Sequence, residues 1–260
     1  MVTDEPIPIR LEMEGRVATL TLNRPERGNA LTPQMMKDIA LCCGQAQSDG
    51  ASVLVITGAG SKAFCSGYDL EQLADSFADD ADAGGHALQE ALAAVEDFAG
   101  ATVALINGPA IGGGVLLALA CDIRWASTDA FFQIPVSRLG LVYPLRGLQA
   151  LVGAVGTTRA FQLLHCGDKV DAPTALTWNL LNGVGEGADW DREARAQIAR
   201  IASHAPLSLA GHHRLVRMIR DGRLDTSEAE RVAMEAIGSQ DAQEGIKAIL
   251  EKRLPQFRGM

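Results

Sequence analysis

The stretch from residue 102 to residue 123, TVALINGPAIGGGVLLALACDI, constrains the fold more than any other part of this chain. It begins with an apolar run, residues 102–106, which is typical of a buried strand. A turn, NGP, leads to three consecutive glycines at positions 112–114 and then to a helix-forming run over residues 115–121. The stretch therefore predicts a strand, a glycine-rich turn and a helix.

Such a turn has a chemical as well as a structural interpretation. Glycine allows the backbone to approach a ligand closely and to adopt positive φ angles. The first N–H groups of a helix have no acceptor within the helix and lie at the positive end of its dipole. A helix that begins with glycines can therefore bind an anion or a developing oxyanion. The alternative is that the glycines only allow the helix and the strand to pack closely.

Length and charge limit the possible classes of protein. With 260 residues we expect one large domain, or a domain with an appendage. The net charge of −9 argues against nucleic acid or an anionic membrane surface as the main partner. No apolar run reaches the roughly 18 residues that a membrane-spanning helix needs. We therefore expect neither a nucleic-acid nor a membrane partner.

The cysteines indicate a reducing environment. Their number is odd, five, and no C-x-x-C pair occurs, which argues against a disulfide framework and against a zinc site. The first ten residues, MVTDEPIPIR, contain no apolar signal core. We therefore expect reduced thiols, no metal and a cytoplasmic location.

The chain before the glycine turn alternates strands with helices. Residues 17–22 alternate apolar and polar side chains and should pair with residues 9–12 in a hairpin. Thr32 and Pro33 are typical of a helix start, and the helix should reach about Ser48. Residues 53–57 predict a buried parallel strand. We expect an acidic mobile loop over residues 75–86 and a helix over 87–98.

After the glycine turn, two short strands are expected at residues 123–126 and 131–134. Helical patterns dominate from Gly147 onward. This order predicts an α/β core over residues 1–200 and a helical C-terminal region over 201–260. The appendage is expected to cover a neighbour in the same subunit or in another. Its amphipathic helices are expected at residues 191–203, 206–220, 226–237 and 241–252.

Four motifs, in order and spread over nearly the whole chain, resemble the enoyl-CoA hydratase/isomerase (crotonase) superfamily. The resemblance implies a crotonase-like spiral of ββα units with a C-terminal helical trimerisation region. It also implies a homotrimer, or a hexamer formed as a dimer of trimers. The motifs are NRPERGNALT, GAGSKAFCSGYDL, INGPAIGGGVLLALACDIRWAS and SQDAQEGIKAILEKRLPQF.

The resemblance also implies a site. In this superfamily an acyl-CoA thioester lies in a cleft, and two backbone N–H groups hold its carbonyl oxygen. The matching positions here are Tyr68 and Gly113, which would stabilise the enolate of the thioester. No separate cofactor is expected, because coenzyme A is part of the substrate.

Further contacts to the coenzyme follow from the same resemblance. Arg24 would meet a phosphate, unless it is an ordinary surface arginine. Phe257 would reach the adenine of a neighbouring subunit, unless the tail only packs on its own chain. Asp69 would hydrogen-bond backbone groups and shape its turn. The full substrate-binding set is Arg24, Lys62, Ala63, Phe64, Ser66, Asp69, Leu70, Leu116, Val136 and Phe257.

The chain departs from the hydratases of this superfamily at two positions. Both glutamates that deliver water to the double bond are replaced, one by Leu116 and the other by Val136. General acid–base catalysis is worth about 10²–10⁴-fold for each group. Efficient hydration by the usual mechanism is therefore not expected, and isomerases that keep only the second glutamate are excluded by the same Val136.

Tyr143 is the remaining catalytic candidate. Its position resembles that of a tyrosine in methylmalonyl-CoA decarboxylase, although that enzyme has a histidine where this chain has Tyr68. The alternative is a half-buried ring whose hydroxyl is already satisfied. Pro144 replaces an aspartate that some relatives use nearby.

The other ionisable groups are weaker candidates. We expect His86 in the loop near the entrance, and His212 and His213 on the surface of the helical region. Asp122 should brace a helix end. Arg138 should pair with an acidic neighbour, and the alternative is that it recognises a carboxylate of the substrate.

Three functions remain open. The chain could be a lyase or isomerase acting on acyl-CoA thioesters, a non-catalytic protein that binds long-chain acyl-CoA, or a hydratase whose acid–base groups lie elsewhere. Leu116 and Val136 make the expected pocket apolar, which suits an acyl chain better than water.

Overall fold

The computed structural model describes residues 7–72, 83–187 and 189–260. Its centre is a six-stranded sheet with the strand order β1-β2-β3-β4-β6-β9. The strands are β1 (Ile9–Glu14), β2 (Val17–Leu22), β3 (Val53–Gly58), β4 (Ala101–Ile106), β6 (Ile123–Ser127) and β9 (Gly183–Gly185).

The first two strands form the expected hairpin. β1 and β2 are antiparallel, and Gly15 in their turn has a φ of 58°. All other pairs in this sheet are parallel, with Val17 beside Val53 and Val53 beside Ala101. Parallel strands need crossover connections, and helices provide most of them.

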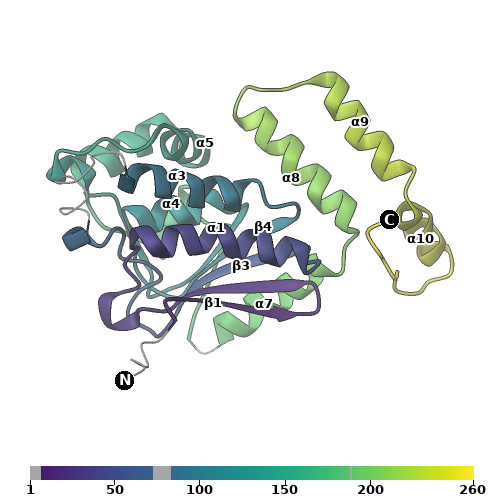
Figure 1. Cartoon of the computed structure of the whole chain (residues 1–260), viewed down its shortest axis with the longest axis horizontal. Helices are drawn as coiled ribbons and strands as arrows, with labels where there is room; N and C mark the ends of the chain where they lie inside the picture. The colour runs from purple at the N-terminus through teal and green to yellow at the C-terminus, as the bar shows by residue number, and fades with distance from the viewer. Residues whose placement is uncertain (1–6, 73–82, 188) are drawn as a thin grey trace.

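Helices cover both faces of the sheet, which explains why the first four residues of β3 are all apolar. Leu54 and Ile56 belong to the core under α1 (Pro33–Ser48), α3 (Ala83–Glu96) and α4 (Gly113–Ala120). Val53 and Val55 face the other way and pack with Ile198 of α7 (Asp189–Ala202). Figure 1 shows α1, α3 and α4 on one side of the strands and α7 on the other. A strand that is buried on two faces loses the alternation of polar and apolar residues.

The start of α1 is as expected, whereas the start of α3 corrects the expected loop. The hydroxyl of Thr32 caps α1 by accepting the Met35 N–H at 3.1 Å. α3 already begins at Ala83, so residues 83–86 are helical, and His86 lies 3.6 Å from Glu90 one turn on. The small residues at positions 83–85 do not stop the helix, because a helix that has formed extends by one residue at a time at little cost. The rest of the expected loop, up to residue 82, lies outside the described residues.

A second, three-stranded sheet lies beside the glycine turn. β5 (Ala110–Ile111) is parallel to β7 (Phe131–Gln133), which is antiparallel to β8 (Val170–Asp171). β5, β8 and β9 were not expected, because strands of two or three residues leave no periodic pattern. The remaining elements of the body are the 3₁₀ turns Pro25–Arg27 and Val136–Leu139, α5 (Leu145–Phe161), the π turn Gln162–Cys166 and α6 (Ala172–Thr177).

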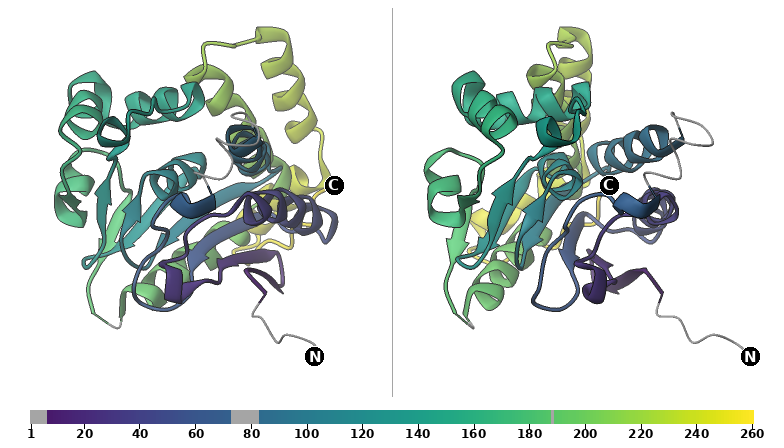
Figure 2. Two further views of the ribbon diagram at one scale, coloured as in Figure 1. Left: turned by 60° about the vertical axis from the view of Figure 1, so that its left-hand side comes forward. Right: turned by 90° about the vertical axis from the view of Figure 1, so that its left-hand side faces the viewer.

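Three helices leave the α/β body at the C-terminal end. They are α8 (Pro206–Arg220), α9 (Thr226–Ile237) and α10 (Gln240–Leu250), and their bounds agree closely with the expected ranges. Figures 1 and 2 show them as an arm that extends away from the body. No helix in the described part of the chain is long and apolar enough to cross a membrane.

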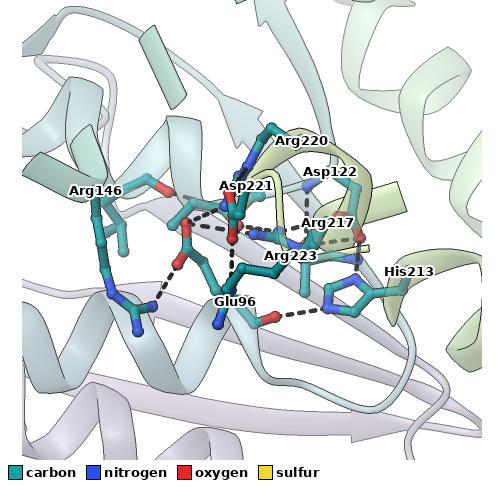
Figure 3. A network of polar contacts seen from close by, with 12 residues as sticks. Glu96, Asp122, Arg146, His213, Arg217, Arg220, Asp221 and Arg223 are labelled. Atoms are coloured by element: carbon teal, nitrogen blue, oxygen red, sulfur yellow. Dashed lines mark hydrogen bonds and ion pairs between the residues drawn. The ribbon is translucent and has the colours of Figure 1, made fainter. Parts of the chain in front are cut away.

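A network of charged side chains joins α8 to the body (Figure 3). Arg217 lies 3.0 Å from Asp122 and 3.4 Å from Glu96, the last residue of α3. His213 binds Asp122 through Nδ1 at 2.8 Å and the Glu96 carbonyl through Nε2 at 2.7 Å. The expected surface position of His213 is wrong: its side chain is only 6% exposed, because its helix packs against the ends of α3 and α4.

Asp122, which follows the end of α4, lies at the centre of this network and joins β4 to α8. Its carboxylate accepts hydrogen bonds from the backbone and the hydroxyl of Thr102 on β4. Burial opposes ionisation of Asp122, but the hydrogen bond and charge of His213 and the charge of Arg217 hold its pKa below the usual value.

Candidate functional site

Two of the three glycines in the triplet are required by the local geometry, and the one between them begins a helix. Gly112 has a φ of 51° and a ψ of −108°, which a side chain would strain. Gly113 is the first residue of α4, so its N–H has no acceptor within the helix. A Cβ atom at Gly114 would lie 2.2 Å from the carbonyl oxygen of Cys65, so the helix packs directly on that strand segment.

The second glycine turn lies between the first motif and this triplet. On one side, the Leu31 N–H donates to the Gly67 carbonyl at 2.7 Å. The Leu31 carbonyl accepts a hydrogen bond from the Asp69 N–H at 2.9 Å. On the other side, Ile111 donates to the Cys65 carbonyl at 2.9 Å. These bonds place the 65–69 segment against the start of α4.

The two expected donor positions are therefore neighbours in space. A Cβ atom at Gly113 would lie 3.6 Å from the backbone nitrogen of Tyr68. A Cβ atom at Gly67, where φ is 100°, would lie 3.4 Å from the backbone nitrogen of Gly113. Glycine at both positions allows the two backbones to approach each other closely. Such a pair of backbone amides, one at a helix start, is suited to stabilising negative charge on an oxygen atom.

The Asp69 carboxylate, 5% exposed, binds the guanidinium of Arg24 at 3.1 Å. Its expected hydrogen bonds to backbone groups stay a prediction. Arg27 lies 3.9 Å away on the other side. Arg24 also donates to the Ala30 carbonyl at 2.9 Å, and its side chain is 19% exposed. Arg24 therefore holds the second glycine turn to the first motif through charge and hydrogen bonds.

Apolar side chains occupy positions 116 and 136, which the resemblance matches to the two glutamates of the hydratases. Leu116 is buried, whereas Val136 is partly exposed at the start of a 3₁₀ turn. Leu116 reaches α5 so closely that a Cβ atom at Gly147 would lie 2.1 Å from its Cδ2 atom. The same Cβ atom would be 3.4 Å from the Tyr143 ring. Sequence reasoning missed Gly147, because nothing near it in the sequence signals this contact.

The two tyrosines differ in position and role. Tyr143 is buried and donates its hydroxyl to the Gly112 carbonyl at 2.9 Å. Burial raises its pKa well above the usual value. Tyr68 is partly exposed, and burial raises the pKa of its hydroxyl to about 12. Both hydroxyls are therefore neutral at pH 7.

The expected coenzyme contacts lie in different surroundings. Lys62 and Leu70 are exposed, whereas Ala63 and Phe64 are buried, and the Ala63 carbonyl accepts a hydrogen bond from the Asn29 amide at 2.8 Å. Ser66 is partly exposed and lies against the first motif, where its N–H donates to the Gly28 carbonyl at 2.9 Å. The segment thus offers one exposed cation, Lys62, beside a fixed backbone.

Phe257 lies on the helical arm. Its backbone carbonyl accepts a hydrogen bond from Arg16, and its ring would lie 3.4 Å from a Cβ atom at Gly245 of α10. The tail beyond it is fixed by Asp241, which accepts the N–H groups of Arg258 and Gly259 at 2.6 and 2.7 Å. Within its own chain, Phe257 therefore packs on the arm.

Two further features, Arg138 and a cavity under the helical arm, lie outside the two glycine turns. Arg138 donates to the Cys166 carbonyl at 3.3 Å and makes no ion pair with a described residue, contrary to the expected acidic partner. A cavity of about 820 Å³ lies between the end of α3, α8 and α9, and its walls include Phe98, Met218 and Val232. The described residues that line it include none from the two glycine turns.

Comparison with known proteins identifies the family of this chain. Residues 12–260 match the enoyl-CoA hydratase/isomerase family. The probable enoyl-CoA hydratase echA6 of Mycobacterium bovis is 37% identical over 94% of this chain and 96% of its own length. The (E)-benzylidenesuccinyl-CoA hydratase of Thauera aromatica is 33% identical over 97% of this chain and its entire length.

Solved structures give the same result for the fold. An enoyl-CoA hydratase/carnithine racemase from Magnetospirillum magneticum superposes with a TM-score of 0.93 at 31% identity, covering 98% of this chain and 97% of its own. A putative enoyl-CoA hydratase/isomerase family protein from Hyphomonas neptunium gives 0.92 at 31% identity, covering 98% of both chains. The match over nearly the whole sequence and the shared fold show that this chain belongs to the enoyl-CoA hydratase/isomerase family.

Proposed function

We propose that this protein is an enzyme that acts on acyl-CoA thioesters by stabilising the thioester enolate between the backbone N–H groups of Tyr68 and Gly113. The observation that supports the proposal is the proximity of these two amides, where the backbone at Gly67 approaches the start of α4. An enolate places negative charge on the thioester oxygen, and one such donor is worth roughly 3–4 kcal/mol in the barrier.

The reaction is a lyase or isomerase step rather than ordinary hydration. Hydration needs groups that move protons at both ends of a double bond, and Leu116 and Val136 occupy those positions. Loss of carbon dioxide from a malonyl-type thioester needs fewer proton-transferring groups than hydration does. The electron pair of the broken C–C bond becomes the enolate, and a proton then returns to carbon. Tyr143 is the residue that we assign to such a decarboxylase-like site.

Turnover tests this proposal directly. The full chain is given crotonyl-CoA and methylmalonyl-CoA, and hydration and carbon dioxide release are measured separately. We expect carbon dioxide release that depends on the thioester, with little or no hydration. Turnover of neither substrate, together with failure to bind either one, would overturn the proposal.

A second candidate function is binding of long-chain acyl-CoA without turnover. The buried Leu116 favours it, because it makes the place of a catalytic carboxylate apolar. A titration with palmitoyl-CoA separates the two functions: micromolar or tighter binding without turnover of any thioester supports the binding protein.

The assignment of the missing acid–base pair has its own test. The double variant Leu116→Glu, Val136→Glu should gain hydration of crotonyl-CoA if both positions face the double bond. Leu116→Gln, Val136→Gln is the matched control, because it has the same shape and no carboxylate. Equal rates in the two variants would show that the pair is misplaced.

We also propose that the protein works as a homotrimer or a dimer of trimers in the cytoplasm, with coenzyme A only as part of its substrate. Large apolar side chains on the arm support assembly through it. Ile249, Leu250 and Leu254 are each at least 78% exposed in the isolated chain. Met234 and Ile237 are 67% and 69% exposed. Sedimentation velocity of the full chain distinguishes one, three and six subunits.

A further inference from the structure

The Tyr143 hydroxyl contacts the same peptide group that carries the Gly113 amide. The carbonyl of Gly112 and the N–H of Gly113 belong to one peptide unit, and in a trans peptide they point in opposite directions. Tyr143 donates to that carbonyl at 2.9 Å. The N–H groups of Val115 and Leu116 donate to it as well, at 3.1 and 3.2 Å.

We propose that Tyr143 is a positioning residue, whose hydroxyl fixes and polarises the 112–113 peptide so that the Gly113 N–H becomes a stronger and better-oriented oxyanion donor. This inference rests on the proposed function of the two amides. A hydrogen bond to the carbonyl draws electron density from the amide nitrogen, so the N–H on the other side becomes a better donor.

Gly112 gives this contact its importance. Glycine explores more backbone conformations than any other residue, so a peptide between Gly112 and Gly113 has little intrinsic preference for one orientation. The two helical N–H groups tie its carbonyl to α4, and the tyrosine adds a third bond from a separate element. Electrostatic stabilisation of a transition state depends on donors that are already oriented before the reaction.

The surroundings keep the hydroxyl in place. Tyr143 is 4% exposed and precedes α5, and its ring lies where a Cβ atom at Gly147 would contact it at 3.4 Å. A buried neutral phenol has one proton to donate, and here the Gly112 carbonyl accepts it. Tyr143 therefore acts on the reaction through the peptide and does not need to touch the substrate.

The experiment measures polarisation of the bound thioester rather than rate alone. Butyryl-CoA labelled with ¹³C at the carbonyl has neither a double bond to hydrate nor a carboxylate to lose. The infrared carbonyl band of this ligand, bound to the full chain, is compared with that of the free ligand for the wild type and Tyr143→Phe. The matched control is Thr57→Val, which removes a hydroxyl that donates to the Leu105 carbonyl at 2.8 Å within the sheet.

We expect a lower carbonyl frequency on binding to the wild type, and a downshift smaller by roughly 10–30% in Tyr143→Phe, as one cooperative hydrogen bond would give. Affinity for butyryl-CoA should change by about threefold or less, because the rest of the coenzyme supplies most of the binding energy. With a turned-over thioester, kcat should fall about tenfold at nearly constant KM, less than the roughly 10²–10³-fold for loss of a whole donor. Thr57→Val should keep the full downshift.

The outcomes separate this inference from the proposed function. If butyryl-CoA does not bind the wild type, or binds without a downshift, the oxyanion site itself is wrong. A normal downshift in the wild type that is unchanged in Tyr143→Phe overturns the positioning role alone. If Tyr143→Phe does not fold, 3-fluorotyrosine at position 143 decides: its hydroxyl is a stronger donor, so the downshift should increase, and an unchanged downshift overturns the role.

Discussion

The two ends of α4 are built on different principles. At its first residue, the amide of Gly113 and the nearby amide of Tyr68 are main-chain groups placed by glycines and by backbone hydrogen bonds. At its other end, Asp122 is surrounded by side chains from α8 and β4, including His213 and Arg217. The candidate chemistry thus depends on backbone geometry, whereas attachment of the helical arm depends on charged side chains.

This difference determines what each end tolerates. The glycine end should be sensitive to any added atom, because its contacts are between backbones that cannot move aside. The charged end should be sensitive to a removed partner, because Glu96 and Arg217 are almost fully buried and each lost partner reduces the compensation of a buried charge.

The largest effect on stability is expected at the charged end. Arg217→Met removes one cationic partner of both Glu96 and Asp122. It should lower the free energy of unfolding by about 3 kcal/mol, the low end for breaking buried ion pairs, because both carboxylates keep other cationic partners. Urea denaturation measures it. Arg214→Met is the matched control on the same helix, since Arg214 is exposed and pairs with Glu228 at the surface. Similar losses in the two variants would show that the buried network contributes nothing specific.

The next effect belongs to the glycine end. Gly114→Ala places a Cβ atom 2.2 Å from the Cys65 carbonyl oxygen, so two backbones must separate. We expect a loss of about 1–3 kcal/mol in stability and, because the amides move apart, loss of the carbonyl downshift with butyryl-CoA. Gly44→Ala in α1, where no atom lies within 4 Å, should instead stabilise the fold by roughly 0.5–1 kcal/mol. An unperturbed downshift in Gly114→Ala contradicts the comparison.

A smaller effect on stability tests the contact between Leu116 and Gly147. In Gly147→Ala the new methyl group collides with Leu116, which should cost about 1–2 kcal/mol. Leu116→Ala alone leaves a cavity and is also destabilising. Because each change relieves the other, the double variant should be more stable than the sum of the two losses predicts. Additive losses would mean that the two residues do not share this space.

The smallest effect concerns pH. The pKa of Asp122 is lowered in the folded state, so the unfolded chain takes up a proton more readily as the pH falls. The stabilisation is therefore fully present above the unfolded pKa of about 4 and is lost as the pH falls through the lower folded pKa. The free energy of unfolding, measured from pH 7 down to pH 3, should fall less steeply in Asp122→Asn than in the wild type. Equal slopes would exclude Asp122 as a contributor.

The features that the sequence predicted correctly are those set by neighbouring residues, and the features it missed are contacts between distant side chains. The hairpin, α1 and the C-terminal helices were predictable because apolar spacing and the Thr32-Pro33 signal act locally. The glycine turns were recognisable because unusual backbone geometry needs a particular residue, as φ at Gly112 and Gly67 shows. The His213 contacts were not predictable, because its partners are 91 and 117 positions away in the sequence.

The sequence by itself determined the family, the alternation of strands and helices, and the two backbone segments that meet at α4, because glycines and periodicity are properties of consecutive residues. Only the tertiary structure decided that Arg24 holds Asp69, that Leu116 requires Gly147, and that the Tyr143 hydroxyl contacts the Gly112 carbonyl. Each of these depends on distances between elements far apart along the chain, which the packing of the whole core sets and no local pattern encodes.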